Sequence, residues 1–341
     1  MPWWEAGFAP FTKTPNPLAS LEFGVSAANP NTINRRIPTS TPPEGLLACG
    51  ANLTTKTMEV CVLRRLSLGY SPCPNDTFIF GGIALGAVQP EGLAFDPFLA
   101  DVEVLNRKAR EAHLDVTKIS FNAAVFCLED YWLLRSGGAL GRGCGPLLVA
   151  KKPRAPEDLA QAVIGIPGRL TTANLLLELL GTHRGPRVEM SFEKVMPAVA
   201  SGAVDAGLVI HEGRFTYSDL GLHVVLDLGA WWEQYTGCPL PLGCIVIRRS
   251  LGRETAAATD RAIGQSLQWA RRHPDAVWPY VRSHAQEMDP QVIARHIETF
   301  VNDFSGDVGT EGERAIRKLL HEAARMAGLS LPDGPLFWTD S

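Results

Sequence analysis

His211 ends the apolar run "AGLVIH" and carries an imidazole, the side chain whose ordinary pKa lies nearest to neutral pH. Glu212, Arg214 and Tyr217 follow it, and their polar groups are suited to tune or orient the ring. A histidine placed there can titrate near neutral pH. Considered alone, however, a single histidine is more often structural, because buried titratable groups also serve packing networks.

Three other apolar runs also end in small or hydrogen-bonding residues. In an open α/β sheet, ligands bind outside the carboxyl ends of the strands, so we expect a small-molecule site where these ends meet. The four segments are Ser71 to Asp76, Lys118-Ile119-Ser120, Pro167 to Thr172, and His211-Glu212.

The segment "PGRLTTANLLLELL" predicts a helix that begins near Thr171 or Thr172. Gly168 permits the preceding turn, and the unpaired N–H groups of the helix start suit a carboxylate or phosphate. The simpler interpretation is that the threonine only caps the helix and that water covers the helix start. Likewise, we expect Asn75 and Asp76 to cap a helix after a turn that prolines stiffen.

Several motifs with known chemistry are incomplete. "HEGRF" lacks the second histidine of a zinc-protease motif, and "GALGRGCGP" is followed by Pro146 and an apolar run where a dinucleotide fold needs a helix. We therefore expect no metal and no cofactor. The remaining histidines on or beside amphipathic helices are expected on solvated faces, and these are His183, His273, His284, His296 and His321.

Strands and helices alternate after Met58, which indicates an α/β architecture with mainly parallel sheets. We expect two lobes with a ligand cleft between them: residues 62–157 plus 243–341 form lobe 1, and residues 158–242 form lobe 2. The two crossings predict a hinge. Predicted strands are 62–70, 114–120, 132–136, 146–150, 162–168, 188–192, 206–211, 222–228 and 243–249. Predicted helices are 76–86, 102–112 (capped by Asp101), 121–128, 171–181 (closed by Gly181), 194–202, 254–272, 275–285, 290–303 and 312–326.

The composition is that of a globular protein, with 341 residues, 45% hydrophobic and 20% charged. A net charge of −4 without a basic cluster argues against nucleic acid as a partner. Seven scattered cysteines without a CxxC pair indicate reduced thiols, and no apolar run is long enough for a membrane span.

Residues 1–57 are rich in proline, asparagine, threonine and serine and lack sustained periodicity. We expect them to be a disordered extension. The tetrapeptide "LLAC" resembles a lipoprotein cleavage box, but no apolar stretch precedes it, so we expect a cytoplasmic protein.

Seven segments taken together resemble the 1,4-dihydroxy-6-naphthoate synthases of the futalosine route to menaquinone. They are "GYSPCPNDTFIF", "VTKISFNAA", "LRSGGALGRGCGPLLVA", "IPGRLTTANLLL", "GLVIHEGRFTY", "LDLGAWWEQYTGCPLPLGCI" and "VNDFSGDVGTEGERAI". The resemblance covers the chain from about Leu66 to the last helix, and it does not extend to the N-terminal segment.

The resemblance implies a two-lobed fold of the type II periplasmic-binding-protein class and a lyase acting on cyclic dehypoxanthinyl futalosine. His211 corresponds to the catalytic base of the family, which removes a carbonyl-activated proton before a sugar-derived fragment leaves and the product aromatises without a cofactor. By the same resemblance Lys118, Ile119, Ser120, Thr171 and Thr172 contact the substrate. Ser71 and Asn75 are expected to line the cleft.

Two alternatives have the same fold. A solute-binding protein would bind a ligand without chemistry, but it needs an export signal. A chorismate dehydratase of the same pathway is the second alternative, and the segments "SPCPNDTF" and "VIHEGRFTY" argue against it.

Overall fold

The computed structural model describes residues 63–340, and the structural statements below concern this part of the chain. The expected disordered extension, residues 1–57, lies outside the described residues. No helix within residues 63–340 has the length and apolar character to cross a membrane.

The first sheet contains six strands in the order β2-β1-β3-β11-β4, with β5 also paired to β11. Its central strand β3 has all five residues buried, although three of them, Thr117, Lys118 and Ser120, are polar. The strands are β1 Arg64–Tyr70, β2 Leu93–Leu99, β3 Val116–Ser120, β4 Tyr131–Leu133, β5 Ala139–Gly141 and β11 Leu240–Arg248.

Strand β2 was not expected from the sequence. It pairs with β1 alone and contains Asp96 and Pro97, so its pattern lacks the apolar alternation of an ordinary strand. Proline is tolerated there because an edge strand leaves one row of backbone groups unpaired.

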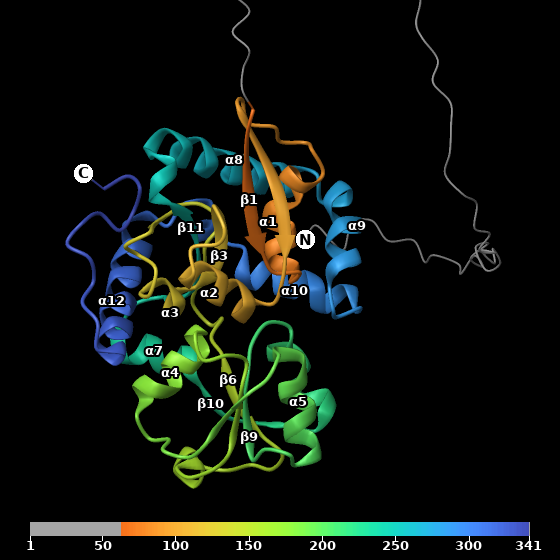
Figure 1. The fold of residues 1–341 in the computed structure, drawn as a ribbon. Coiled ribbons are helices and arrows are strands. Elements are labelled where there is room, and N and C mark those ends of the chain that lie inside the picture. The colour runs from red at the N-terminus through yellow and green to blue at the C-terminus, as the bar shows by residue number, and fades with distance from the viewer. Residues whose placement is uncertain (1–62, 341) are drawn as a thin grey trace, which may run out of the picture. The chain divides into compact units, whose positions relative to one another are not determined.

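Helices α1, α8, α9 and α10 pack together beside the first sheet, and α12 packs on α3 and β11 (Figure 1). Apolar residues of α12 recur at helical spacing, and Gly328 ends the helix with a φ of +66°. The helices of this lobe are α1 Pro74–Ala84, α2 Val102–Arg110, α3 Phe121–Ala124, α8 Arg253–Arg272, α9 Pro274–His284, α10 Pro290–Phe300, α11 Asp303–Gly306 and α12 Gly309–Ala327. As predicted, Asp101 caps α2 by accepting from the Glu103 N–H over 2.8 Å.

The second sheet has five strands in the order β10-β6-β9-β7-β8 (Figure 1). Its strands are β6 Leu147–Ala150, β7 Ile164–Ile166, β8 Arg187–Glu189, β9 Ala206–Val209 and β10 His223–Asp227. Its helices are α4 Thr172–Leu180, α5 Phe192–Ser201, α6 Gly213–Thr216 and α7 Leu228–Thr236. Short 3₁₀ helices span Pro156–Leu159, Tyr217–Leu220 and Arg249–Leu251.

The pairing of β6 differs from the expected first-lobe range of residues 62–157. Strand β6 pairs antiparallel with β9 and β10 in the second sheet, so the chain leaves the first sheet before Leu147. A short, fully buried apolar strand carries no signal for which sheet it joins.

Both sheets are mixed, which corrects the expectation of mainly parallel sheets. The strand β11 runs antiparallel to β3, β4 and β5, and β6 runs antiparallel to β9 and β10. The first sheet becomes mixed because the chain returns to it through β11, which lies beside β5 with Leu240 opposite Gly141. The two crossings between the sheets therefore lie side by side, and a hinge there stays a prediction.

Two glycines let the crossing before β6 pack against the start of α7. A Cβ at Gly145 would overlap the backbone of Gly229, and a Cβ at Gly229 would meet the backbone of Gly145. Backbone atoms cannot move aside as a flexible side chain can. Only glycine at both positions allows this contact.

We predict that Gly145→Ala lowers the free energy of unfolding by about 1–3 kcal/mol, because the added methyl group forces two backbones apart. Urea unfolding of this variant and of Gly334→Ala, where a Cβ meets nothing within 4 Å, makes the comparison. Equal stability of the two variants would contradict the close packing of Gly145 on Gly229.

Candidate functional site

A cleft with about 750 Å³ of empty space, including its open mouth, lies between the two sheets. Its walls come from the strand ends of the first lobe and from α4 and the end of β9 in the second. All eight residues that the sequence analysis assigned to a site line this cleft, namely Ser71, Asn75, Lys118, Ile119, Ser120, Thr171, Thr172 and His211.

The turn between β1 and α1 is organised around the carboxylate of Asp76. Its Oδ2 accepts from the backbone N–H and the hydroxyl of Ser71, over 3.0 and 2.8 Å. Its Oδ1 accepts from Asn75 Nδ2 over 2.9 Å and pairs with Lys118 Nζ over 2.5 Å. Cys73 is the N-cap residue of α1 and no side chain caps this helix, so the expected capping by Asn75 and Asp76 is wrong.

The end of β3 presents Lys118 and Ser120 to the cleft. Both are about 5% exposed. Asn106 of α2 donates to the Ser120 hydroxyl oxygen over 3.2 Å and accepts from its backbone N–H over 2.9 Å. The hydroxyl group therefore keeps its own proton to donate to a ligand.

The start of α4 has the threonine N-cap that the sequence predicts. Thr171 is the N-cap residue and accepts from the Asn174 N–H over 3.3 Å, while Gly168 bends the chain with a φ of +147°. The hydroxyl of Thr171 donates to Gly168 O over 2.7 Å, and that of Thr172 donates to Leu242 O over 2.8 Å. Both hydroxyl protons are thus used within the protein, so neither hydroxyl group is a free donor for a ligand.

His211 lies at the end of β9 with a φ of +53°, a left-handed backbone conformation that is uncommon outside glycine. Its ring meets Phe192 edge-on, with the centroids 4.8 Å apart. Burial lowers the pKa of His211 to about 4; Asp76 opposes this shift and Lys118 adds to it. The imidazole is therefore neutral near pH 7, as a base requires, and strained backbone of this kind clusters at functional sites.

His296 of α10 stacks on His211, with centroids 5.9 Å apart and planes 9° from parallel. The side chain is 0% exposed, and its Nε2 lies 3.1 Å from Asn75 Oδ1. The expectation of a solvated face is thus wrong for His296, and also for His183, which is buried with Nε2 2.9 Å from Ala162 O. The local sequence around each of these two histidines is compatible with an exposed side chain. Their burial results from neighbouring elements of the fold.

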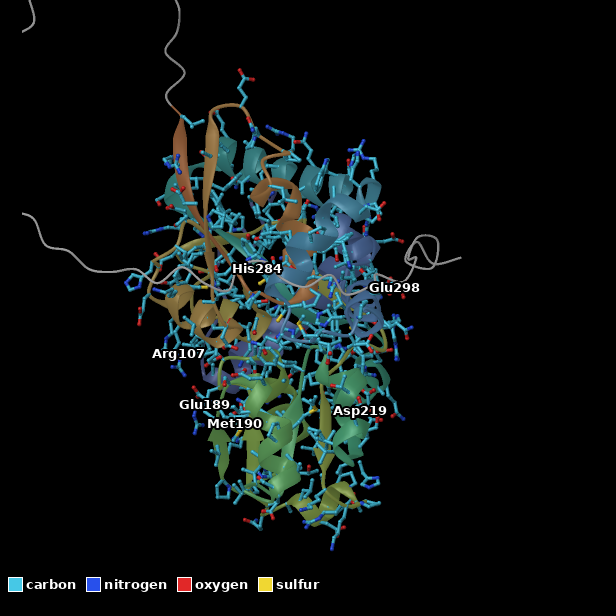
Figure 2. The ribbon with its side chains drawn as sticks, turned by 90° about the vertical axis from the view of Figure 1, so that its right-hand side faces the viewer. Arg107, Glu189, Met190, Asp219, His284 and Glu298 are labelled. Carbon is cyan, nitrogen blue, oxygen red and sulfur yellow. The ribbon has the colours of Figure 1, made fainter. Side chains whose placement is uncertain are left out.

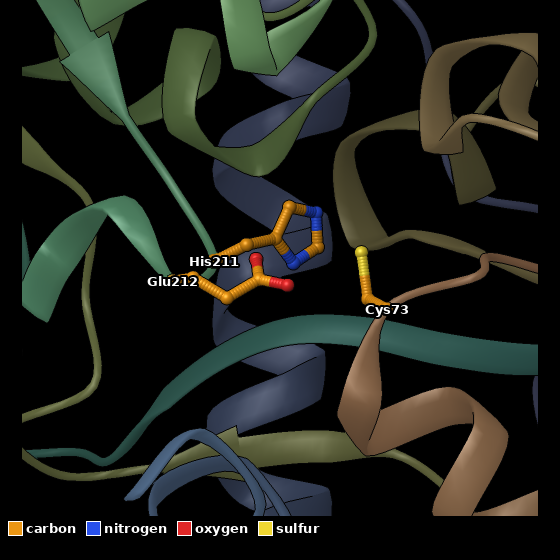
Figure 3. A group of neighbouring side chains, drawn as sticks. All are labelled: Cys73, His211 and Glu212. Carbon is orange, nitrogen blue, oxygen red and sulfur yellow. The ribbon is translucent and has the colours of Figure 1, made fainter. Parts of the chain in front are cut away.

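Cys73 and Glu212 are the other close neighbours of the His211 ring (Figure 3). A donor atom of each of the three residues lies within 4.8 Å of the other two. Such donor types also occur in metal sites. Burial raises the pKa of the Cys73 thiol well above its usual range, so without a metal ion the thiol is protonated.

Arg214 does not orient His211 as the sequence suggested. Its guanidinium donates to Gly145 O and to Asp227 Oδ2, each over 2.6 Å. Arg214 lines the cleft from the second lobe, and its partners come from the crossing before β6 and from the start of α7. No sequence signal links these three positions.

Contacts across the cleft hold the lobes together. Glu103 of α2 accepts from the Leu170 N–H over 3.2 Å. Arg107 of the same helix pairs with Glu189 of β8, and Figure 2 shows the two residues where the lobes meet. The His211–His296 stack also joins the lobes.

A family model described as menaquinone biosynthesis matches residues 66–325. A 1,4-dihydroxy-6-naphthoate synthase of Thermus thermophilus is 50% identical over 277 residues, which are 81% of this chain and 100% of the relative. A protein of the same name from Streptomyces coelicolor is 46% identical over 264 residues, 76% of this chain and 93% of the relative.

Solved structures agree on the fold. A crystal structure from Archaeoglobus fulgidus has a TM-score of 0.73 at 37% identity and covers 77% of this chain and 98% of its own. A Candida albicans protein described as having the generic periplasmic binding protein fold has a TM-score of 0.58 at 13% identity, covering 80% and 92%. The predicted two-lobed fold is thereby confirmed. The chain belongs to the menaquinone biosynthesis family, with the 1,4-dihydroxy-6-naphthoate synthases.

Proposed function

We propose that this protein is a lyase that converts cyclic dehypoxanthinyl futalosine to 1,4-dihydroxy-6-naphthoate, with His211 as the base. The names of its relatives support the reaction. The single observation that carries the assignment of His211 is its place in the cleft, where a strained backbone holds the imidazole among the residues that line the same cavity as Lys118 and Ser120.

The chemistry is a proton removal followed by loss of a fragment. His211 takes a C–H proton next to the substrate carbonyl, and the electron pair expels the sugar-derived fragment, which takes up a proton. Aromatisation of the bicyclic product drives the step. A positioned general base contributes about 10² to 10⁴ in rate, and positioning within the closed cleft contributes the rest.

The polar walls of the cleft suit a substrate with one carboxylate and several oxygens. The helix start at Thr171 and Thr172 is assigned to the carboxylate. The Ser120 hydroxyl and the Lys118 ammonium, which the Asp76 carboxylate holds in place, are assigned to oxygen substituents. Ile119 contributes apolar surface to the ring system.

We place the reaction in the cytoplasm. The five cysteines within the described residues are free and buried, in agreement with reduced thiols. Incubation of the protein with cyclic dehypoxanthinyl futalosine and EDTA, followed by detection of the naphthoate, tests the activity directly. Binding without product would instead favour a solute-binding protein, and turnover of chorismate would favour a dehydratase.

We predict that His211→Asn lowers kcat by about 10² to 10⁴ while substrate binding is retained, because the base is lost. Asparagine tolerates the left-handed backbone of this position better than alanine does. Steady-state kinetics and a thermal melt give the comparison. Turnover near the wild-type rate by a folded variant would refute the role of His211.

A second prediction concerns the helix start. The double variant Thr171→Val, Thr172→Val removes the N-cap and the bond to Leu242 O, so the first turn of α4 no longer holds the carboxylate in place. We expect KM to rise about tenfold, which corresponds to the free energy of one lost charge-assisted hydrogen bond. Thr310→Val on the exposed surface of α12 is the matched control. An unchanged KM and kcat would leave Thr171 and Thr172 as plain structural residues.

A further inference from the structure

A buried carboxyl group lies behind His211, and the reaction proposed above does not use it. Glu212 is 6% exposed, and neither of its carboxyl oxygens meets a hydrogen-bond donor of another residue. An ionised carboxylate in such surroundings is strongly destabilised. A protonated Glu212 is neutral, and its O–H group needs one hydrogen-bond acceptor.

The ring of His296 offers a nitrogen acceptor close to this carboxyl group. Asn75 donates through Nδ2 to Asp76, so the Oδ1 of Asn75 faces Nε2 of His296 at 3.1 Å. An amide oxygen only accepts, which places the proton of the neutral ring on Nε2 and a lone pair on Nδ1. Nδ1 lies 3.7 Å from Oε2 of Glu212. This distance is longer than a hydrogen bond, and neither atom has another hydrogen-bond partner. An ionised Glu212 would direct its lone pairs at the lone pair of this nitrogen, whereas a carboxylic acid directs its proton at it and donates to it on closer approach.

The electrostatics of the cluster agree with this hydrogen-bond pattern. Burial raises the pKa of Glu212 to about 7, and the carboxylate of Glu287 adds to the shift. Burial also holds the pKa of His296 well below its usual range, so the proton stays on the carboxyl group. The titratable and charged groups that face Glu212, His211 and His296 are Cys73 and Asp76 of α1, Lys118 of β3, and Glu287 of the segment before α10.

We propose that Glu212 is a positioning residue that works in its protonated form: it directs its proton toward Nδ1 of His296 and adds no second carboxylate charge beside His211 during turnover. This inference rests on the proposed function.

The reason lies in the proton balance of the reaction. His211 takes a proton from carbon and becomes an imidazolium, and the expelled fragment must then receive a proton. Beside a neutral carboxylic acid the imidazolium is a strong acid and gives its proton up readily. Beside an ionised Glu212 the proton would stay on His211 in a buried ion pair, and turnover would slow.

The test compares the pH dependence of kcat for the wild type, Glu212→Gln and Glu212→Leu. We expect wild-type kcat to fall about tenfold for each pH unit above about pH 7, as Glu212 loses its proton. Glutamine donates an N–H to His296 and cannot ionise, so Glu212→Gln should restore most of the activity that Glu212→Leu loses and keep it up to pH 9. Glu254→Gln, an exposed position on α8, should follow the wild-type profile.

Three results would overturn the inference: a wild-type profile without this decline, the same decline in Glu212→Gln, or a Glu212→Gln variant as inactive as Glu212→Leu. The last of these would mean that the carboxyl group itself is required.

Unfolding in urea separates this inference from the proposed reaction, because it needs no substrate. A carboxyl group whose pKa is raised in the folded state stabilises the fold below its ordinary pKa of 4.5, and this contribution is lost as the pH rises through about 7. The stability gap in favour of Glu212→Gln should therefore widen between pH 5 and pH 8. A constant gap would show that Glu212 is ionised throughout and would overturn the inference even in an active enzyme. A lack of turnover with a widening gap would contradict the proposed reaction alone.

Discussion

The buried carboxylate of Asp76 is the interaction on which the rest of the site depends. It gathers Ser71, Asn75 and Lys118 from the β1–α1 turn and from β3, and it compensates the charge of a lysine that is 5% exposed. A buried ion pair of this kind is tolerated only when further hydrogen bonds satisfy its remaining lone pairs. Through Asn75 the same carboxylate sets the proton position on His296, and so the environment of His211. The segment "SPCPND" thus holds the Asp76 carboxylate in place.

The contact between the lobes and the environment of the base depend on the same residues. His211 and Glu212 come from the second lobe, whereas His296, Cys73 and Asn75 come from the first. Bringing them together removes water from the imidazole and from the carboxyl group, which lowers the pKa of His211 and raises that of Glu212. Both shifts favour the neutral forms.

The sequence was sufficient to predict the strand ends that converge on the cleft, because apolar periodicity locates β3, β9 and α4 and polar residues mark where they end. The family of the chain and its two-lobed fold could also be predicted, from the order and spacing of seven segments. The functional roles of His211, Thr171 and Thr172 stay predictions that the geometry supports. The burial of His296 could not be foreseen, since a polar residue on an amphipathic helix is ordinarily exposed. The same holds for β6, whose partner strands no local pattern encodes, and for the pairing of Arg214 with Gly145 and Asp227.

A crystal structure of His211→Asn with cyclic dehypoxanthinyl futalosine bound tests the central claim most directly. The account predicts the substrate carboxylate at the start of α4 and the carbon that loses its proton within about 3.5 Å of the position that the imidazole occupies in the wild type. A substrate bound in the reverse orientation, with that carbon facing away from position 211, would contradict it.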